Sequence, residues 1–219
     1  MENELIENHK RYLERIALYR QFGYDIDEER NYVIEKACPF SGNILEAGTG
    51  KGYFSLALAR LGFHFTTFDI SATEQWYAGL NLAYHGLVGY VRFDVADLER
   101  LPYPDASYDA IFAVNIIHHL ASVDLAVNEL IRVLSPSGKI VLSDFNEKGL
   151  AVVDQIHALD GRKHKPGMAT LREARAVLSR HGFQVEKHAG IHQDVIVSFR
   201  EQKGSAKDHW PEGHFFEKG

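Results

Sequence analysis

Alternating glycines near the start of the chain are the residues whose types and spacing point most directly to chemistry. The segment Glu46-Ala-Gly48-Thr-Gly50-Lys-Gly52 follows a short apolar run and precedes a run with helical spacing. Glycines at every second position let the backbone turn sharply and approach a bound molecule closely. The free N–H groups and the positive dipole end of the following helix point at the same place. The segment therefore predicts a strand–loop–helix unit that holds a small polar molecule.

Three interpretations of this loop compete. A plain turn explains one or two glycines, but not a carboxylate followed by three alternating ones. A dinucleotide site requires the pattern Gly-x-Gly-x-x-Gly, and Tyr53 occupies its third glycine position. Glu46 would also repel a pyrophosphate at this point. A cationic or zwitterionic ligand fits better, and S-adenosylmethionine carries a sulfonium, an ammonium and one carboxylate but no phosphate.

The glycine loop resembles the first motif of the class I S-adenosylmethionine-dependent methyltransferases, in particular the small-molecule enzymes with a methyltransferase type 11-like domain. The resemblance continues in order to about residue 145 and includes the run Arg132-Val-Leu-Ser-Pro-Ser-Gly-Lys-Ile-Val-Leu-Ser-Asp144. It implies that the chain binds S-adenosylmethionine as its cofactor and leaves S-adenosylhomocysteine after methyl transfer. The cofactor-binding residues that it implies in the loop are Glu46, Gly48, Thr49 and Gly50.

An acidic residue ends the next β-rich run, at Asp69. In the matching family position a carboxylate accepts hydrogen bonds from both ribose hydroxyls, and two oxygens suit two neighbouring donors. The resemblance also implies that Ile70 lies against the adenine. Asp69 could instead cap the following helix, but Ser71 and Glu74 already form a capping box there. We therefore favour the ribose role.

A third strand is expected at residues 90–93 and leads into Asp94-Val95. In the family an Asp at this point meets the amino edge of the adenine, and the next backbone N–H meets a ring nitrogen. The segment that follows is longer than the commonest family version, so Asp97 is a rival for this role. We prefer Asp94 because it directly follows the strand.

Polar residues also follow the apolar strand expected at residues 110–114. Asn115 lies where ligands of open α/β sheets bind, beyond the carboxyl ends of the strands. The resemblance implies that this segment lines the methionine half of the cofactor. His118 and His119 are candidates for a base that removes a proton from the accepting atom. Alternatively, one histidine packs and forms a hydrogen bond while the other begins a helix.

To bring these residues together, the chain is expected to fold as a three-layer, Rossmann-like α/β sandwich. Its sheet is expected to be seven-stranded and mainly parallel, with an antiparallel last strand. Residues 1–40 are expected to form two N-terminal helices, which either cover one face of the sheet or act as a lid that brings Tyr12, Tyr19 or Tyr24 to the ligand. Residues 41–203 form the S-adenosylmethionine-binding domain, and residues 204–219 form an aromatic C-terminal tail. Helical or strand periodicity and capping or stop residues predict helices at 2–21, 27–37, 53–61, 72–85, 122–134, 151–159 and 170–181, and strands at 43–46, 64–69, 90–93, 110–114, 139–143, 183–187 and 194–199.

Composition limits the remaining possibilities. The 219 residues suit one α/β domain, and the formal charge of −6 without a dense basic face argues mildly against a nucleic-acid partner. No apolar run approaches the ~20 residues of a membrane span. The N-terminus does not have the pattern of a signal peptide, so we expect a cytoplasmic protein. The single cysteine, Cys38, excludes an internal disulfide. The twelve histidines bring no convincing set of three ligands, so no metal is expected.

The sequence leaves the acceptor open. Short additions to the domain favour a small-molecule acceptor and a monomer or homodimer. Three cations at residues 162–165 could hold an anionic substrate, although a solvated loop explains them as well. Two rival functions remain: a non-catalytic S-adenosylmethionine-binding or scaffold protein, and a nicotinamide-dependent oxidoreductase, against which Glu46 and Tyr53 argue.

Overall fold

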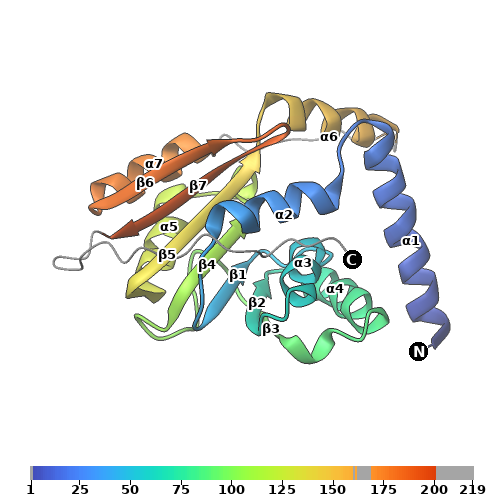
Figure 1. Ribbon diagram of the computed structural model, residues 1–219, viewed down its shortest axis with the longest axis horizontal. Coiled ribbons are helices and arrows are strands. Elements are labelled where there is room, and N and C mark those ends of the chain that lie inside the picture. Colours follow the sequence, from blue (N-terminus) through green and yellow to red (C-terminus); the bar gives the residue numbers. More distant parts are fainter. Residues whose placement is uncertain (1, 160, 162–168, 201–219) are drawn as a thin grey trace.

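The chain folds around one seven-stranded sheet with helices on both faces (Figure 1). The computed structural model describes residues 2–159, 161 and 169–200. The sheet has the order β3-β2-β1-β4-β5-β7-β6. Its strands are β1 (Ile44–Ala47), β2 (Phe65–Asp69), β3 (Val91–Val95), β4 (Tyr108–Val114), β5 (Leu134–Phe145), β6 (Phe183–Ala189) and β7 (Gln193–Arg200).

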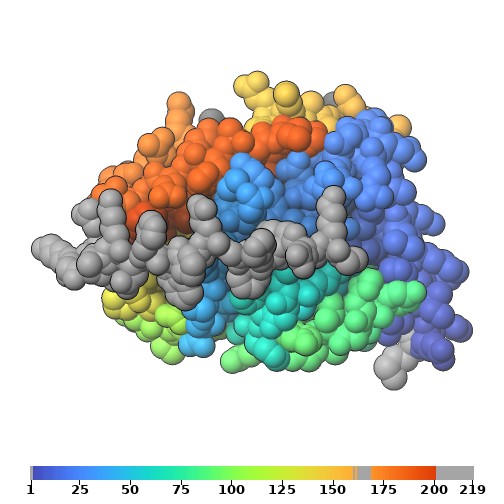
Figure 2. All heavy atoms as spheres, viewed as in Figure 1, coloured from blue at the N-terminus to red at the C-terminus, as the bar shows by residue number. Residues whose placement is uncertain are grey.

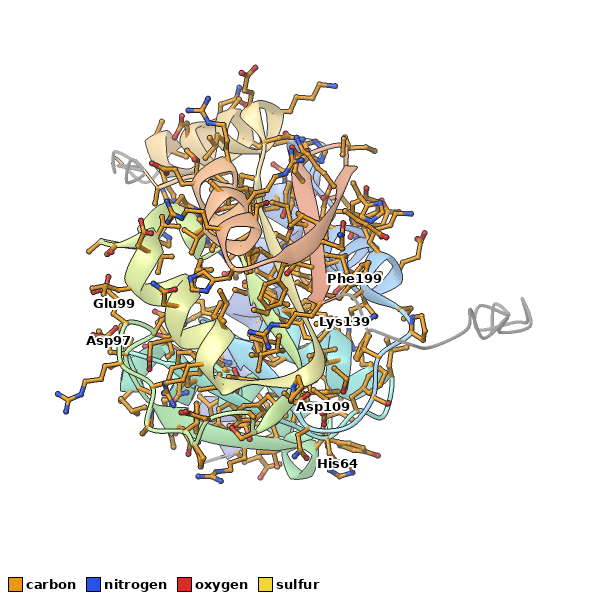
Figure 3. All side chains as sticks on the ribbon, turned by 90° about the vertical axis from the view of Figure 1, so that its left-hand side faces the viewer. His64, Asp97, Glu99, Asp109, Lys139 and Phe199 are labelled. Atoms are coloured by element: carbon orange, nitrogen blue, oxygen red, sulfur yellow. The ribbon has the colours of Figure 1, made fainter. Side chains whose placement is uncertain are left out.

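Strand direction confirms the predicted fold class. The five strands from β3 to β5 are parallel, and β7 runs antiparallel to both of its neighbours. Lys139 of β5 and Phe199 of β7 are register partners and lie side by side in Figure 3. Because β1 and β4 are adjacent while the order reverses between them, the loops after these two strands open a crevice at the carboxyl edge of the sheet.

Seven α-helices and two short 3-10 turns connect the strands of the described chain. They are α1 (Glu2–Gln21), α2 (Ile26–Ala37), α3 (Tyr53–Arg60), α4 (Ala72–Tyr84), η1 (Val88–Tyr90), η2 (Ile117–His119), α5 (Val123–Val133), α6 (Glu147–Leu159) and α7 (Leu171–Arg180). One apolar cluster lies under α1, α2, α3 and α6, and a second lies under α5 and α7 on the other face. The central strand β4 contributes buried residues to both clusters, which is why it is almost wholly apolar.

Helix α1 packs against α4 and forms the right-hand side of the molecule in the view of Figure 2. The buried Asn8 side chain donates a hydrogen bond to Asn81 Oδ1 at 2.7 Å, and the Asn81 amide donates to the backbone oxygen of Lys51 at 2.9 Å. A chain of amides thus connects α1 to the glycine loop. The two N-terminal helices expected from the sequence are present.

Element boundaries differ from the prediction in a few places. Asp25, not Asp27, caps α2, because the Asp25 carboxylate accepts the N–H groups of Asp27 and Glu28. Strand β5 begins at Leu134, which pairs with Tyr108 before a register shift. The cation run at 162–165 and the aromatic tail at 204–219 lie outside the described residues. Within the described part of the chain, no helix combines the length and apolar character needed to cross a bilayer.

Leu130 and Leu125 give a matched test of the packing of α5. Leu130 is fully buried under the sheet, whereas Leu125 on the same helix is 53% exposed. We expect Leu130→Ala to lower the free energy of unfolding by about 2–5 kcal/mol, because it leaves a cavity. Leu125→Ala should change it by less than about 0.5 kcal/mol. Urea denaturation measures both, and equal losses would contradict the packing described here.

Candidate functional site

The glycine loop after β1 is hydrogen-bonded to the end of β2. The N–H groups of Gly48 and Thr49 both donate to the Phe68 carbonyl, at 2.8 and 3.0 Å. Gly48 has φ of +83°, and a Cβ there would lie 2.5 Å from Ile116 Cδ1. A Cβ on Gly52 would lie 2.9 Å from the Cβ of Ala78, whereas one on Gly50 would meet nothing within 4 Å. The outer glycines therefore allow close packing, and Gly50 borders open space.

Glu46 lies beneath this loop and not at its surface. The side chain is 1% exposed and accepts a hydrogen bond from Ser55 Oγ at 2.5 Å. Burial raises the pKa of Glu46 to about 7, although hydrogen bonds from Ser55 and Thr67 oppose the shift. The sequence analysis placed its charge against the ligand. In the structure Glu46 supports the loop from below, so the expected repulsion of a pyrophosphate does not follow from its position.

Thr49 also points inward. It is 4% exposed, and its hydroxyl lies 2.7 Å from the Thr67 hydroxyl. The Gln75 amide donates to Thr49 Oγ1 at 3.3 Å and to the Asp94 carbonyl at 2.6 Å. These bonds tie the loop to β2, β3 and α4. Thr49 therefore offers its backbone, and not its side chain, to a ligand above the loop.

Asp69 closes the side of the loop at the end of β2. Its two carboxylate oxygens accept the N–H groups of Gly50, at 2.8 Å, and Ser71, at 2.9 Å. Each oxygen keeps further acceptor capacity. Beside Asp69 is a cavity of about 430 Å³, which we call the glycine-loop cavity. It is lined by Gly48, Phe68, Asp69, Ile70, Ala96, Asp97, Leu98, Glu99, Ile116, His119, Leu120 and Ala121.

Of the two candidate aspartates at and beyond the end of β3, Asp97 lines this cavity and Asp94 does not. The Asp94 carboxylate accepts hydrogen bonds from Tyr103 Oη at 3.1 Å and Arg92 Nε at 3.3 Å, and Asp94 does not line the cavity. Asp97 does line it, and lies next to Glu99 at the surface of the molecule (Figure 3). Asp97 therefore lies beside the cavity because the chain continues past the end of β3, whereas the Asp94 side chain is hydrogen-bonded elsewhere; the adenine role of either residue stays a prediction.

Apolar residues border the same region. Ile70 is 72% exposed and lines the glycine-loop cavity, as the sequence analysis expected of a residue that lies against a flat ring. Val95 is 60% exposed but is not part of the cavity lining. Large exposed apolar side chains beside a cavity are suited to contact with a ligand.

A second cavity of about 200 Å³, which we call the central cavity, lies next to the first and shares His119 with it. Asn115 lines it from the end of β4, with φ of +56°. Tyr19 and Tyr24 reach it from α1 and from the α1–α2 turn, whereas Tyr12 does not. Three of the histidines, His118, His119 and His157, also line it. The cavity is therefore polar at one end and walled by the N-terminal helices.

His118 lines this cavity and forms a buried pair with Asp144, which does not line it. Their side chains are 9% and 7% exposed, and His118 Nδ1 lies 2.6 Å from Asp144 Oδ1. The backbone N–H groups of His118 and Phe145 also donate to the Asp144 carboxylate, each at 2.8 Å. Three hydrogen bonds fix the carboxylate, which in turn fixes the ring. A proton transfer by His118 would then use Nε2, since Asp144 occupies Nδ1.

Arg30 brings a positive charge to the same place. It is 9% exposed, and its guanidinium donates to Tyr24 Oη at 3.2 Å and to Gln193 Oε1 at 3.3 Å. With the Asn115 amide oriented to satisfy its neighbours, the Asn115 oxygen accepts from Arg30 at 3.0 Å. Among the described residues Arg30 has no carboxylate partner. A buried cation paired only with neutral groups favours an anionic ligand group beside it.

The sequence analysis missed two of these residues. Asp144 lies at the carboxyl end of β5 just as Asp69 lies at the carboxyl end of β2, so its position at the end of a parallel strand was a usable signal. Arg30 had no such signal, because it is one charged residue in a helix with many. Within the described ranges no group of three metal-ligating side chains lies together, and His192 pairs with Glu29 at 2.8 Å.

Comparison with known proteins agrees with this geometry. Residues 45–142 match a family model described as a methyltransferase domain. The chain is 29% identical over 174 residues to a malonyl-[acyl-carrier protein] O-methyltransferase of Serratia marcescens, a match that covers 78% of this chain and 66% of that protein. It is 35% identical over 104 residues to the 27-O-demethylrifamycin SV methyltransferase of Amycolatopsis mediterranei, covering 47% of this chain and 38% of that protein. The chain thus spans less than two thirds of the length of these relatives.

A solved structure has the same fold. A SAM-dependent methyltransferase from Aquifex aeolicus superposes with a TM-score of 0.61 at 20% identity, over 77% of this chain and 88% of that one. The similarity reaches well beyond the segment that matches the family model, and it includes most of the sheet.

The buried carboxyl group of Glu46 predicts a pH effect on stability. Its pKa of about 7 in the folded state lies above the ordinary value of 4.5. Between these values the folded protein holds a proton that the unfolded chain has released, so the free energy of unfolding falls as pH rises, by up to about 1.4 kcal/mol per pH unit. In Glu46→Gln this contribution is absent. Urea denaturation at several pH values between 4.5 and 7 should show a shallower pH dependence for the variant, and identical slopes would contradict the assignment.

Proposed function

We propose that the chain is a class I S-adenosylmethionine-dependent methyltransferase, which transfers a methyl group from this cofactor to a small-molecule acceptor in the central cavity. The observation that carries the proposal is the carboxylate of Asp69, which accepts the Gly50 N–H beside a cavity that shares His119 with the central cavity, where His118 of the buried His–Asp pair also lies. The parts needed to hold a donor and to activate an acceptor therefore meet at one edge of the sheet.

The glycine-loop cavity fits the adenosine half of the cofactor. Asp69 would accept hydrogen bonds from the ribose hydroxyls, and Ile70 would lie against the adenine. Asp97, with the backbone N–H of Leu98, would meet the polar edge of the adenine in place of Asp94 and Val95. An acidic lining suits this half because the hydroxyl and amino groups of adenosine are donors.

The central cavity fits the methionine half and the reacting atoms. The Arg30 guanidinium would pair with the cofactor carboxylate, and the chain near Gly48 and Asn115 would hold the ammonium group. The sulfonium makes the methyl group reactive by itself, so the protein contributes mainly alignment of the acceptor with the methyl–sulfur bond and exclusion of water. Tyr19 and Tyr24 on the N-terminal segment exclude water from one side, which is the lid role considered from the sequence.

His118 would act as the general base for an acceptor whose nucleophilic atom carries a proton. The bond from the acceptor atom to the methyl carbon forms as the methyl–sulfur bond breaks, and the proton passes to His118 Nε2. Asp144 orients the ring and stabilises the imidazolium that results. His119 lines both cavities and positions the two halves of the reaction.

Cofactor titration tests the donor site. We expect S-adenosylhomocysteine to bind the wild-type protein in isothermal titration calorimetry, and Asp69→Ala to raise the Kd by about tenfold to a hundredfold, since hydrogen bonds to a charged group contribute about 1.5–3 kcal/mol. Asp97→Ala should raise it by roughly tenfold. Asp94→Ala serves as the matched control and should change it by less than about threefold. If S-adenosylhomocysteine did not bind the wild-type protein, the result would contradict the proposed function.

Substitution of the base tests the chemistry. With an acceptor found by screening for S-adenosylhomocysteine release, we expect His118→Gln to lower kcat by about 10²–10⁴ and to leave the Kd for S-adenosylhomocysteine unchanged. Asp144→Asn should lower kcat and shift its pH profile, because the ring loses its charged partner. An unchanged kcat in both variants would show that the acceptor needs no base.

A further inference from the structure

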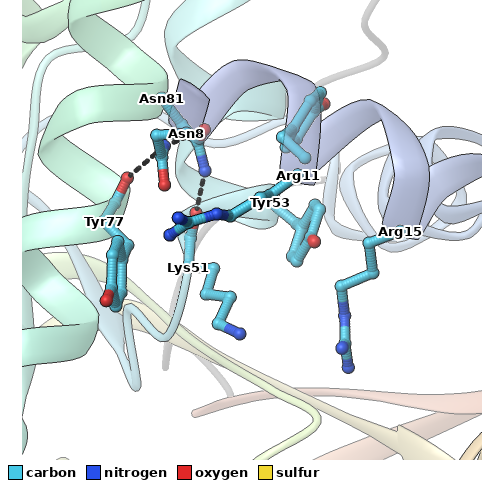
Figure 4. A pocket seen from close by; sticks show the side chains of 8 residues that line it. Asn8, Arg11, Arg15, Lys51, Tyr53, Tyr77 and Asn81 are labelled. Atoms are coloured by element: carbon cyan, nitrogen blue, oxygen red, sulfur yellow. Dashed lines mark hydrogen bonds between the residues drawn. The ribbon is translucent and has the colours of Figure 1, made fainter. Parts of the chain in front are cut away.

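A third cavity, which we call the α1 cavity, lies between α1, the glycine loop and α4 and has a volume of about 270 Å³ (Figure 4). Its charged lining residues are all cations: Arg11, Arg15 and Lys51. The rest of the lining consists of two asparagines and three tyrosines. Figure 4 shows Arg11 extending from α1 over Lys51, Arg15 extending from α1 further along the helix, and Tyr53 between the two arginines. In a chain with a formal charge of −6, a cavity lined by cations alone is a local reversal of sign.

Neither arginine forms an ion pair within 4.0 Å in the described part of the chain, although Glu7, the partner of Lys10, is close enough to Arg11 for the two charges to attract each other. Arg11 has no ion-pair partner there, and Arg15 donates only to the neutral Tyr19 hydroxyl, at 3.0 Å. Other cations on α1 are paired: Lys10 with Glu7 at 2.7 Å, and Arg20 with Asp25 at 2.7 Å. The unpaired cations are therefore confined to the face of α1 that borders the cavity.

The arginines are held in place by buried contacts of their own helix. Asn8 and Tyr12 on the same face are 8% and 5% exposed, and Asn8 is hydrogen-bonded to Asn81. The Tyr12 ring stacks on Tyr53 with a centroid separation of 5.4 Å. Since these contacts fix one face of α1, Arg11 and Arg15 face the cavity together, spaced by about one helical turn.

The α1 cavity adjoins the central cavity, because Arg15 and Tyr53 line both. Among the described residues that line the two cavities, Arg11, Arg15 and Arg30 carry a positive charge and none is a carboxylate; the Asp144 carboxylate lies behind His118 and pairs with its ring. On the proposed function, the cofactor brings one carboxylate, which Arg30 would pair, together with an ammonium and a sulfonium. Arg11 and Arg15 then lie next to a positively charged donor, an arrangement that favours an anion as the second ligand.

Building on the proposed function, we propose that the methyl acceptor is anionic and that Arg11 and Arg15 bind its carboxylate or phosphate group in the α1 cavity. The acceptor then extends past Tyr53 into the central cavity, where its nucleophilic atom meets the methyl group. Two guanidinium groups, each with planar paired donors, match the oxygens of either anion. The neutral lining of asparagine and tyrosine side chains supplies further donors without opposing charge.

Anion binding to the cofactor-loaded protein tests this inference. The protein is saturated with S-adenosylhomocysteine, so that the cofactor carboxylate already occupies its own place, and inorganic phosphate or succinate is titrated at low ionic strength by isothermal titration calorimetry. We expect at least one of the two anions to bind with a Kd of about 1 mM or tighter. The tighter of the two identifies the group that the acceptor carries. In R11Q/R15Q the Kd should rise by at least about tenfold.

A charge-matched control separates this site from general surface charge. K10Q/K36Q removes two positive charges from α1 and α2 at exposed positions outside the cavity, and should leave anion binding within about twofold. The Kd for S-adenosylhomocysteine should change by less than about threefold in R11Q/R15Q.

Three results would overturn the inference. The first is that neither anion binds the wild-type protein. The second is that R11Q/R15Q and K10Q/K36Q lose equal affinity for the anion. The third is that R11Q/R15Q loses as much affinity for S-adenosylhomocysteine as for the anion. The last would mean that the arginines serve the cofactor carboxylate. Failure of the wild type to bind S-adenosylhomocysteine would be a separate result, since it removes the proposed function itself.

Discussion

The fastening of the glycine loop to β2 is the interaction on which the rest of the site depends. Two N–H groups of the loop share the Phe68 carbonyl, and a third reaches the Asp69 carboxylate at the end of the same strand. Because these hydrogen bonds hold the loop against the end of β2, Asp69 and Gly50 are adjacent beside the cavity. The buried Glu46 and Thr49 support the loop from below, and the cost of burying the Glu46 charge appears as its raised pKa.

Charge divides the crevice above the sheet into two halves. The side near β2 and β3 presents Asp69, Asp97 and Glu99, whereas the charged residues that line the side near α1 and α2, among those the structure describes, are cations. A donor molecule with hydroxyl and amino groups at one end and a carboxylate at the other complements this division. The cationic half extends beyond what the donor carboxylate needs, and this excess is the basis of the proposal that the acceptor is anionic.

The N-terminal helices are part of the site and not merely a cover. Arg30 of α2 is buried against Asn115 at the end of β4 and Gln193 at the start of β7, so three distant segments meet around one guanidinium. Helix α1 reaches the glycine loop through the amides of Asn8 and Asn81. Two amide hydrogen bonds thus connect α1 to the Lys51 backbone of the loop.

The sequence by itself determined the order of strands and helices, the fold class and the carboxyl-edge residues Asp69 and Asn115. These follow from local periodicity and from the rule that parallel strands place their ends together. Only the tertiary structure shows that Asp97 lines the glycine-loop cavity and Asp94 does not, because side-chain direction past a strand end depends on the exact path of the chain. Only the tertiary structure also shows that Arg30 and the α1 arginines lie at the crevice. Contacts between helices that are distant in the sequence leave no periodic signal in the sequence of either helix.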